Sequence, residues 1–338
     1  MRRIQGGCLV VTLMMASVAT EGCNGDCKNG RCVETLVTQV AFPQGLVLDS
    51  SNLYWVDGGG LSSKSPVTSG RVMKLSLGSG DPSTLVSGVV AQNLRVDATS
   101  LYWTNAASGT VAGAVLKMPV GGGKPTTLAT GVDPQGGIAL DKTNVYWTNE
   151  DGTLQSVAIV PGGMPTVLAN NQATTMGALG ALNWVLTVDA TNVYWANANN
   201  GTVASVPIAG GEVTTIASGQ AEPWDVAVDA TNIYWINAGT AGAGQGTVMK
   251  QALMGQMPIT LASGQAGPDK LAIDASNVYW VNTGTGKNDG AVVSVPISGG
   301  SPTTLEGGLP GPVSVAVNGS TLFWSDATSD DLYSLSPK

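Results

Sequence analysis

The sequence has 338 residues, of which 46 are glycine, and carries a net charge of −8 with no histidine. It has no clustered stripe of Lys and Arg, so we expect no nucleic-acid partner, because such binding depends on cationic contacts to phosphates. Without histidine, the commonest general base and the commonest nitrogen ligand for metals are missing. We therefore expect no metal and no cofactor, and any catalysis would have to use carboxylates, lysine or tyrosine.

The N-terminal segment has the pattern of an export signal. Arg2 and Arg3 form a short basic region, and residues 4–19 are apolar but too few to span a bilayer comfortably. Small residues at 17–19 offer a cleavage site. We predict that residues 1–22 are a signal peptide and that the mature protein is extracytoplasmic: periplasmic, secreted or an outer-membrane lipoprotein.

A cysteine-containing linker, residues 23–32, follows the signal. If Cys23 becomes a lipidated N-terminal residue, Cys27 and Cys32 remain as one short-loop disulfide, which an oxidising compartment permits. Glu21 fits a lipoprotein cleavage site poorly, so cleavage earlier in the chain is the competing interpretation, and zinc binding by the three thiols is a third. A lipid on Cys23 would be the chain's only membrane anchor.

The rest of the chain is a repeat of about 45 residues, the size of one four-stranded propeller blade. In each copy, short apolar runs are separated by Gly, Asn, Asp and Pro, as strands and hairpins require. In the fifth copy the four expected strands are DVAVD, NIYWIN, TVMKQAL and ITLASG. The repeated aromatic pairs are Tyr54-Trp55, Tyr102-Trp103, Tyr146-Trp147, Tyr194-Trp195, Tyr234-Trp235, Tyr279-Trp280 and Phe323-Trp324.

The two ends of the repeat region complete each other. The last copy contains three strands and then the sequence stops at Lys338, whereas VETLVTQV at residues 33–40 matches the fourth-strand phrases PTTLATG and VTTIASG. We predict that this N-terminal strand closes the ring as the outer strand of the last blade, which leaves few free sheet edges. Residues 33–338 are thus expected to form an all-β, seven-bladed β-propeller of four-stranded antiparallel blades, and the protein to be a monomer.

The repeated polar residues are interpreted as structural, because chemistry is not expected to recur in every blade. The aromatic pairs should pack blade against blade. The residue that opens each turn, the D of D-x-x-N/S in most copies, should bond the backbone two residues on. The Asn or Asp two places after each Trp should hold the loop that leaves the second strand. The turn residues are Asp49, Asp97, Asp141, Asp189, Asp229, Asp274 and Asn318.

The phrases YWTN at Tyr102 and Tyr146 and FWSD at Phe323 resemble the YWTD repeats of the low-density-lipoprotein receptor family and those of bacterial exported propellers. The resemblance covers residues 33–338 and implies a rigid binding scaffold. Most copies have Asn where that family has Asp, and the receptor domains have six blades. Streptogramin-lyase-like propellers are similar in architecture, but their chemistry depends on histidine.

Loop lengths indicate where a ligand would bind. The loops after the second strand and between blades vary in length and should share one face, where binding usually occurs. Residues five places before each turn acid should surround the channel mouth on this face. The candidate ligand-binding residues there are Gln44, Gln92, Trp184, Trp224, Asp225, Asp269 and Lys270. Trp184 and Trp224 would either form a platform for a sugar or peptide or pack under a long loop.

Two functions remain open at this stage. The first is an exported, non-catalytic binding protein that recognises a protein, peptide or glycan through its variable loops. The second is a glycoside hydrolase or lyase with paired carboxylates at the channel mouth, either Asp225 with Asp269 or Glu150 with Asp151.

Overall fold

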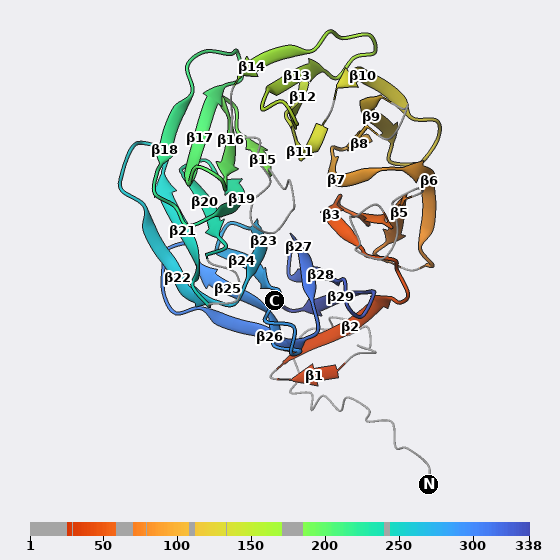
Figure 1. Ribbon diagram of the computed structural model, residues 1–338. Helices are drawn as coiled ribbons and strands as arrows, with labels where there is room; N and C mark the ends of the chain where they lie inside the picture. Colours follow the sequence, from red (N-terminus) through yellow and green to blue (C-terminus); the bar gives the residue numbers. More distant parts are fainter. Residues whose placement is uncertain are drawn as a thin grey trace, which may run out of the picture.

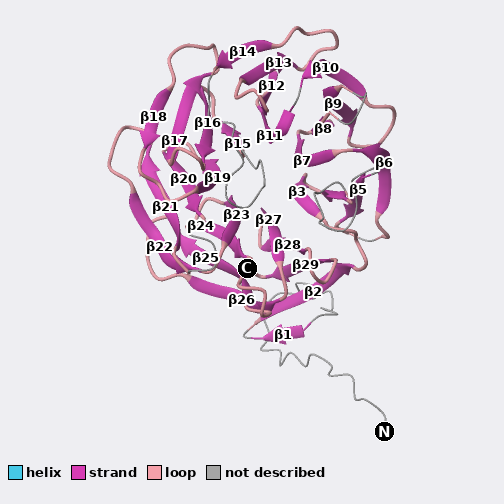
Figure 2. Ribbon diagram, viewed as in Figure 1, coloured by secondary structure: helices cyan, strands magenta, loops and turns pink. Residues whose placement is uncertain are grey.

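The computed structural model describes residues 26–28, 30–58, 70–78, 80–107, 112–132, 134–170, 185–239 and 244–338. Its 29 strands form seven antiparallel sheets arranged in a ring (Figures 1 and 2). The chain is therefore a seven-bladed β-propeller, as the repeat count predicts. The predicted signal peptide, Cys23 and Trp184 lie outside the described residues.

Each blade runs from an innermost strand to an outermost one, in chain order. Blade 1 contains β3 (Gln44–Leu48), β4 (Asn52–Asp57), β5 (Gly70–Ser76) and β6 (Ser83–Val89). Blade 2 contains β7 (Ala91–Val96), β8 (Ser100–Asn105), β9 (Gly113–Pro119) and β10 (Thr126–Val132). Blade 3 contains β11 (Pro134–Leu140), β12 (Asn144–Asn149), β13 (Leu154–Ala158) and β14 (Thr166–Ala169).

Blades 4 to 6 repeat the order. Blade 4 contains β15 (Leu186–Val188), β16 (Asn192–Asn197), β17 (Thr202–Pro207) and β18 (Thr214–Ala217). Blade 5 contains β19 (Pro223–Val228), β20 (Asn232–Asn237), β21 (Gly246–Ala252) and β22 (Ile259–Gln265). Blade 6 contains β23 (Pro268–Ile273), β24 (Asn277–Asn282), β25 (Gly290–Pro296) and β26 (Thr303–Leu309).

Blade 7 joins the two ends of the chain, as predicted. It contains β27 (Pro312–Asn318), β28 (Thr321–Asp326) and β29 (Asp331–Ser336), and the N-terminal strand β2 (Arg31–Val37) pairs with β29. In Figure 1 the red β2 lies beside the dark blue β29. The closing strand begins and ends slightly earlier than the predicted 33–40, and it ends before the chain turns at Gln39, where φ is 61°.

A fifth strand, β1 (Asp26–Lys28), covers part of β2 and was not expected from the sequence. Cys27 and Cys32 are cross-strand partners in this hairpin and form a disulfide. The C-terminal part of the linker is therefore folded against blade 7.

The aromatic pairs pack neighbouring blades together. Adjacent residues of a strand face opposite sides of a sheet, so Tyr54 of blade 1 packs in one cluster with Trp103 of blade 2, and Phe323 of blade 7 packs with Trp55 of blade 1. All seven Trp of the pairs are at most 1% exposed. Burial of one Trp side chain contributes on the order of 4–6 kcal/mol as an upper estimate. The repetition is architectural, as the sequence indicated.

The turn aspartates have the predicted structural role. Asp141 Oδ1 accepts hydrogen bonds from the backbone N–H groups of Thr143 (2.6 Å) and Asn144 (2.8 Å), and Oδ2 accepts one from the Tyr146 hydroxyl (2.7 Å). Partial burial acts to raise the pKa of Asp141, but the bonds from Tyr146 and the backbone together lower it. The same Tyr-to-Asp bond occurs in the first six blades.

In blades 1, 2 and 5 a lysine of the third strand lies over the ring of this tyrosine. Lys250 pairs across the sheet with Tyr234, and its Nζ lies 5.9 Å from the ring centroid. In blade 6 the residue opposite Tyr279 is Ser294, and the cation comes instead from Lys338, whose Nζ lies 5.1 Å from the Tyr279 centroid and pairs with Asp274. The last residue of the chain thus fastens blade 7 to blade 6.

The loops divide into two classes that lie on opposite faces of the ring. Turns between first and second strands are uniformly short, as at residues 49–51 and 97–99, and they define what we call the turn face. On the other face, the variable-loop face, the connection from second to third strand occupies residues 58–69 in blade 1 but only 150–153 in blade 3. The connection from β14 to β15 occupies residues 170–185, whereas β10 to β11 is joined by residue 133 alone.

Glycine is required where a variable loop meets the next blade. Gly290 is the first residue of β25, and a Cβ atom there would lie 2.6 Å from Cδ of Pro312 and 2.8 Å from the carbonyl oxygen of Leu309. The absence of a side chain lets blades 6 and 7 approach closely on the variable-loop face.

Candidate functional site

The innermost strands begin at the variable-loop face, and the predicted ring positions lie at their starts. Gln44 is the first residue of β3, and Gln92, Trp224 and Asp269 are each the second residue of β7, β19 and β23. These four predicted residues therefore share one layer around the axis of the ring. The side chain of Gln92 is not described.

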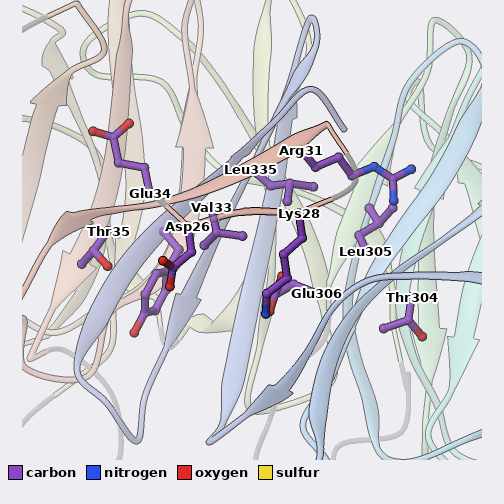
Figure 3. A pocket seen from close by; sticks show the side chains of 11 residues that line it. Asp26, Lys28, Arg31, Val33, Glu34, Thr35, Thr304, Leu305, Glu306 and Leu335 are labelled. Atoms are coloured by element: carbon purple, nitrogen blue, oxygen red, sulfur yellow. The ribbon is translucent and has the colours of Figure 1, made fainter. Parts of the chain in front are cut away.

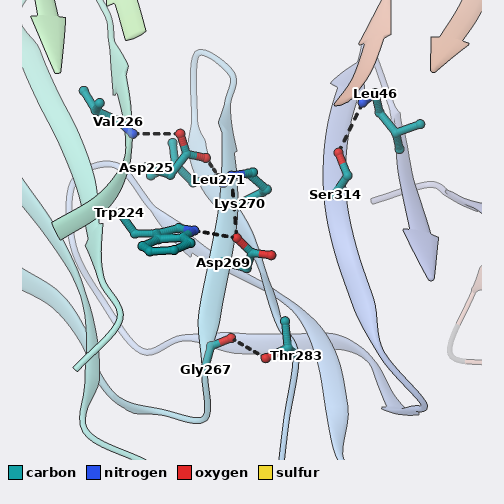
Figure 4. Close-up of polar contacts among 10 residues, drawn as sticks. All are labelled: Leu46, Trp224, Asp225, Val226, Gly267, Asp269, Lys270, Leu271, Thr283 and Ser314. Atoms are coloured by element: carbon teal, nitrogen blue, oxygen red, sulfur yellow. Dashed lines mark hydrogen bonds and ion pairs between the residues drawn. The ribbon is translucent and has the colours of Figure 1, made fainter. Parts of the chain in front are cut away.

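Three of the predicted side chains are in direct contact (Figure 4). Trp224 Nε1 donates a hydrogen bond of 2.8 Å to Asp269 Oδ1, and Lys270 Nζ lies 3.6 Å from the same oxygen. Trp224 is only 8% exposed. Its indole therefore connects blade 5 to blade 6 more than it offers an open stacking surface.

Asp225 connects the same two blades through the backbone. It is 4% exposed, its Oδ1 accepts the N–H of Val226 (2.8 Å), and its Oδ2 accepts the N–H of Leu271 in the next blade (2.8 Å). Ser314, at the equivalent position of blade 7, accepts the N–H of Leu46 in blade 1 at 3.2 Å. Figure 4 shows both of these contacts. Asp225 thus belongs to a structural device that recurs between blades.

The electrostatic environment of Asp225 includes a cation that the sequence analysis missed. Burial raises the pKa of Asp225, while the charge of Lys270 and the two backbone N–H groups oppose this rise. Arg95, in β7, reaches from blade 2 to blade 4, where its Nη2 donates to the carbonyl oxygen of Leu186 at 3.2 Å. Burial lowers the pKa of Arg95, and the charge of Asp225 opposes that shift.

We call Arg95, Trp224, Asp225, Asp269 and Lys270 the axial cluster. A sequence signal for Arg95 existed, because the residue two places before the turn acid is small in the other six blades. Those residues are Val47, Ala139, Thr187, Ala227, Ala272 and Ala316. A single long cation in such a series points to a role outside the common architecture.

Two buried nitrogen atoms at this level have no hydrogen-bond partner among the described residues. They are Nζ of Lys270 and Nε2 of Gln44. Because buried donors are nearly always satisfied, these two groups are available to a ligand. The side chains that the structure brings together are thus mainly donors.

The acid pair proposed for catalysis is constrained by these contacts. Both oxygens of Asp225 already accept backbone N–H groups, and Oδ1 of Asp269 accepts the Trp224 indole. In the other proposed pair, Asp151 Oδ1 accepts the backbone N–H of Thr153 at 2.9 Å, as a turn residue does. Neither geometry leaves two free carboxylates facing a substrate.

The Asn and Asp residues after each Trp hold loops, as expected. Asn282 Nδ2 donates to Gln265 Oε1 (2.9 Å), which also accepts the Trp280 indole N–H (3.0 Å). Asp326 accepts the backbone N–H groups of Gly311 (2.9 Å) and Thr328 (2.9 Å). These bonds fix the bases of the variable loops.

Three hollows among the described residues lie away from the axial cluster, and two of them are clearly larger than the third. One of about 730 Å³ runs between β2 and β26 and is lined by charged side chains including Lys28, Arg31 and Glu306 (Figure 3). The other, of about 790 Å³, opens on the turn face beside Asp141 and Asp189. The sequence analysis anticipated neither of them.

Within the described residues, no group of three or more Cys, Asp or Glu side chains is arranged to hold a metal ion. The described part of the chain also contains no helix of a length and hydrophobicity that would cross a bilayer.

Comparison with solved structures supports the fold. The chain is similar to one in a nidogen and laminin complex, with 20% identity and a TM-score of 0.50 over 68% of this chain and 85% of that one. The matched chain of that complex is a β-propeller. A protein of unknown function from Bacteroides thetaiotaomicron gives 13% identity and a TM-score of 0.57 over 90% of this chain and 76% of that chain.

A designed protein, Ika8, gives 12% identity and a TM-score of 0.58 over 88% of this chain and 98% of that chain. No protein-family model and no curated protein matches the sequence. The likenesses to solved structures therefore concern the fold alone.

Proposed function

We propose that this β-propeller is an exported, non-catalytic binding protein of the YWTD-like type that recognises a protein, peptide or glycan on its variable-loop face. One observation carries the proposal. Polar groups common to the blades form structural bonds within a blade, as from Tyr146 to Asp141, or between neighbouring blades, as from Asn282 to Gln265. The axial cluster and the long loops, in contrast, differ from blade to blade.

The physical reason is that a rigid ring can hold irregular loops in fixed positions, which lowers the entropy lost on binding. A chain of similar fold belongs to a complex of nidogen and laminin, which supports a protein partner by analogy. Residues 1–22 and Cys23 support an extracytoplasmic location, with a lipid on Cys23 as the means of attachment to a membrane.

Binding can be tested with glycan and peptide arrays. The double variant Trp184→Ala/Trp224→Ala removes both predicted aromatic residues of the variable-loop face, and circular dichroism checks that the fold persists. Lys142→Ala, an exposed change on the turn face, is the control. We expect the double variant to lose the array signal and the control to keep it; equal signals from both would contradict the choice of face.

Export can be tested separately by mass spectrometry of the mature protein. An N-terminus at Cys23 with an added diacylglycerol mass supports the lipoprotein. An N-terminus before Cys23 supports a soluble exported protein, and an intact Met1 with both arginines contradicts export.

A further inference from the structure

Lys270 has a side chain unlike its counterparts in the other blades. It lies four residues before the turn acid, where Asp225 of blade 5 and Ser314 of blade 7 accept a backbone N–H of the next blade. Blades 1, 3 and 4 have Gly45, Gly137 and Val185 there. A lysine has no acceptor. Lys270 therefore cannot perform the structural task of Asp225 and Ser314, and its Nζ is left buried without a hydrogen-bond partner.

Arg95 breaks a rule of the innermost strands. Its position is occupied by small side chains in the six other blades. Its Nη1 donates to the carbonyl oxygen of Leu94 at 2.8 Å and its Nη2 to that of Leu186 at 3.2 Å. A guanidinium has five N–H groups, so further donors remain.

The two cations interact with the same buried carboxylate. Arg95 comes from blade 2 and Lys270 from blade 6, and each interacts electrostatically with Asp225 of blade 5. Each oxygen of Asp225 already accepts one backbone N–H group, and the ion pair of Lys270 with Asp269, at 3.6 Å, is too long to be a hydrogen bond. The cluster has more buried donors than acceptors.

We propose that the axial cluster binds a carboxylate group of the ligand, for which Lys270 and Arg95 supply the charge and Gln44 a further donor. The inference rests on the proposed binding function and specifies its ligand. Charge-assisted hydrogen bonds to a carboxylate are the strongest that these donors can make. Two kinds of ligand carry such a carboxylate: an acidic sugar and a peptide with a free C-terminus.

The indole N–H of Trp224 is a spectroscopic reporter for this site, because it bonds the carboxylate beside Lys270. In ¹⁵N-labelled protein its signal is assigned with Trp224→Phe. Glucuronate and N-acetylglycine are titrated against their uncharged counterparts glucose and N-acetylglycinamide, with sodium chloride at matched ionic strength. We expect a saturable shift of the Trp224 signal with at least one carboxylate and with neither neutral compound, and the responding carboxylate identifies the source.

Lys270→Met should weaken the binding of that carboxylate about tenfold or more. Lys287→Met is the matched control, because this exposed lysine lies in a variable loop of the same blade and its loss changes the net charge equally. Lys270→Arg, which keeps the charge, covers the case in which the Met variant does not fold, and it should retain binding.

Three results would overturn the carboxylate inference: no shift with either carboxylate, equal shifts with the neutral compounds, or equal weakening by Lys270→Met and Lys287→Met. The array experiment separates this failure from that of the binding function. The array could yield a neutral ligand that the double Trp variant no longer binds and that Lys270→Met binds unchanged. That result would support the binding function and contradict the carboxylate inference.

Discussion

The bond from tyrosine to the turn aspartate allows a quantitative test of the architecture. In Tyr146→Phe, Asp141 loses a hydrogen bond of 2.7 Å but keeps the backbone N–H groups of Thr143 and Asn144. A hydrogen bond to a charged group contributes about 1.5–3 kcal/mol. Because Asp141 is half-buried and retains other donors, we expect a loss of about 1.5 kcal/mol at pH 7, measured by denaturant unfolding.

The loss should depend on pH in a defined direction. The folded state lowers the pKa of Asp141, so the stability that this group contributes is present above its unfolded pKa and disappears as the pH falls through the lower, folded pKa. The cost of Tyr146→Phe should therefore shrink in acid. In a cycle with Asp141→Asn, the two changes should be less than additive at pH 7.

An equal cost at pH 7 and in acid would refute this reasoning, and so would strict additivity with Asp141→Asn. Blade 7 provides a natural reference, because it has Phe323 and Asn318 in place of the Tyr and Asp. The bond is thus a stabilising addition to the blade and not a condition for its formation.

Three further predictions concern the joints of the ring. Gly290→Ala should lower the free energy of unfolding by about 1–3 kcal/mol because its Cβ would collide with the next blade, whereas Gly121→Ala, which has open space, should change it little; equal effects would contradict the steric argument. Deleting residues 26–37 should expose the edge of β29 and cause aggregation, measured by light scattering; a monomer of unchanged melting temperature would argue against closure by β2. Replacing Cys27 and Cys32 with Ser should speed amide hydrogen exchange in β1 while leaving that of β4 and β28 unchanged; faster exchange in those two strands would show that the hairpin supports the core.

The fold could be predicted from sequence because its determinants are local and repeated. Tyr-Trp in a strand places one ring on each face of a sheet, and a D-x-x-N/S turn joins two strands, so counting copies gave the number of blades. The missing strand after Leu335 and the extra one near Val33 gave the closure. Repetition made each weak local signal strong.

What only the tertiary structure decided is which residues from different blades meet. The contact between Trp224 and Asp269 joins positions 45 residues apart. The reach of Arg95 to Leu186 joins non-neighbouring blades, and Lys338 takes the place of a lysine that blade 6 lacks. These encounters depend on side-chain length and direction around the axis, which a pattern within one repeat does not contain.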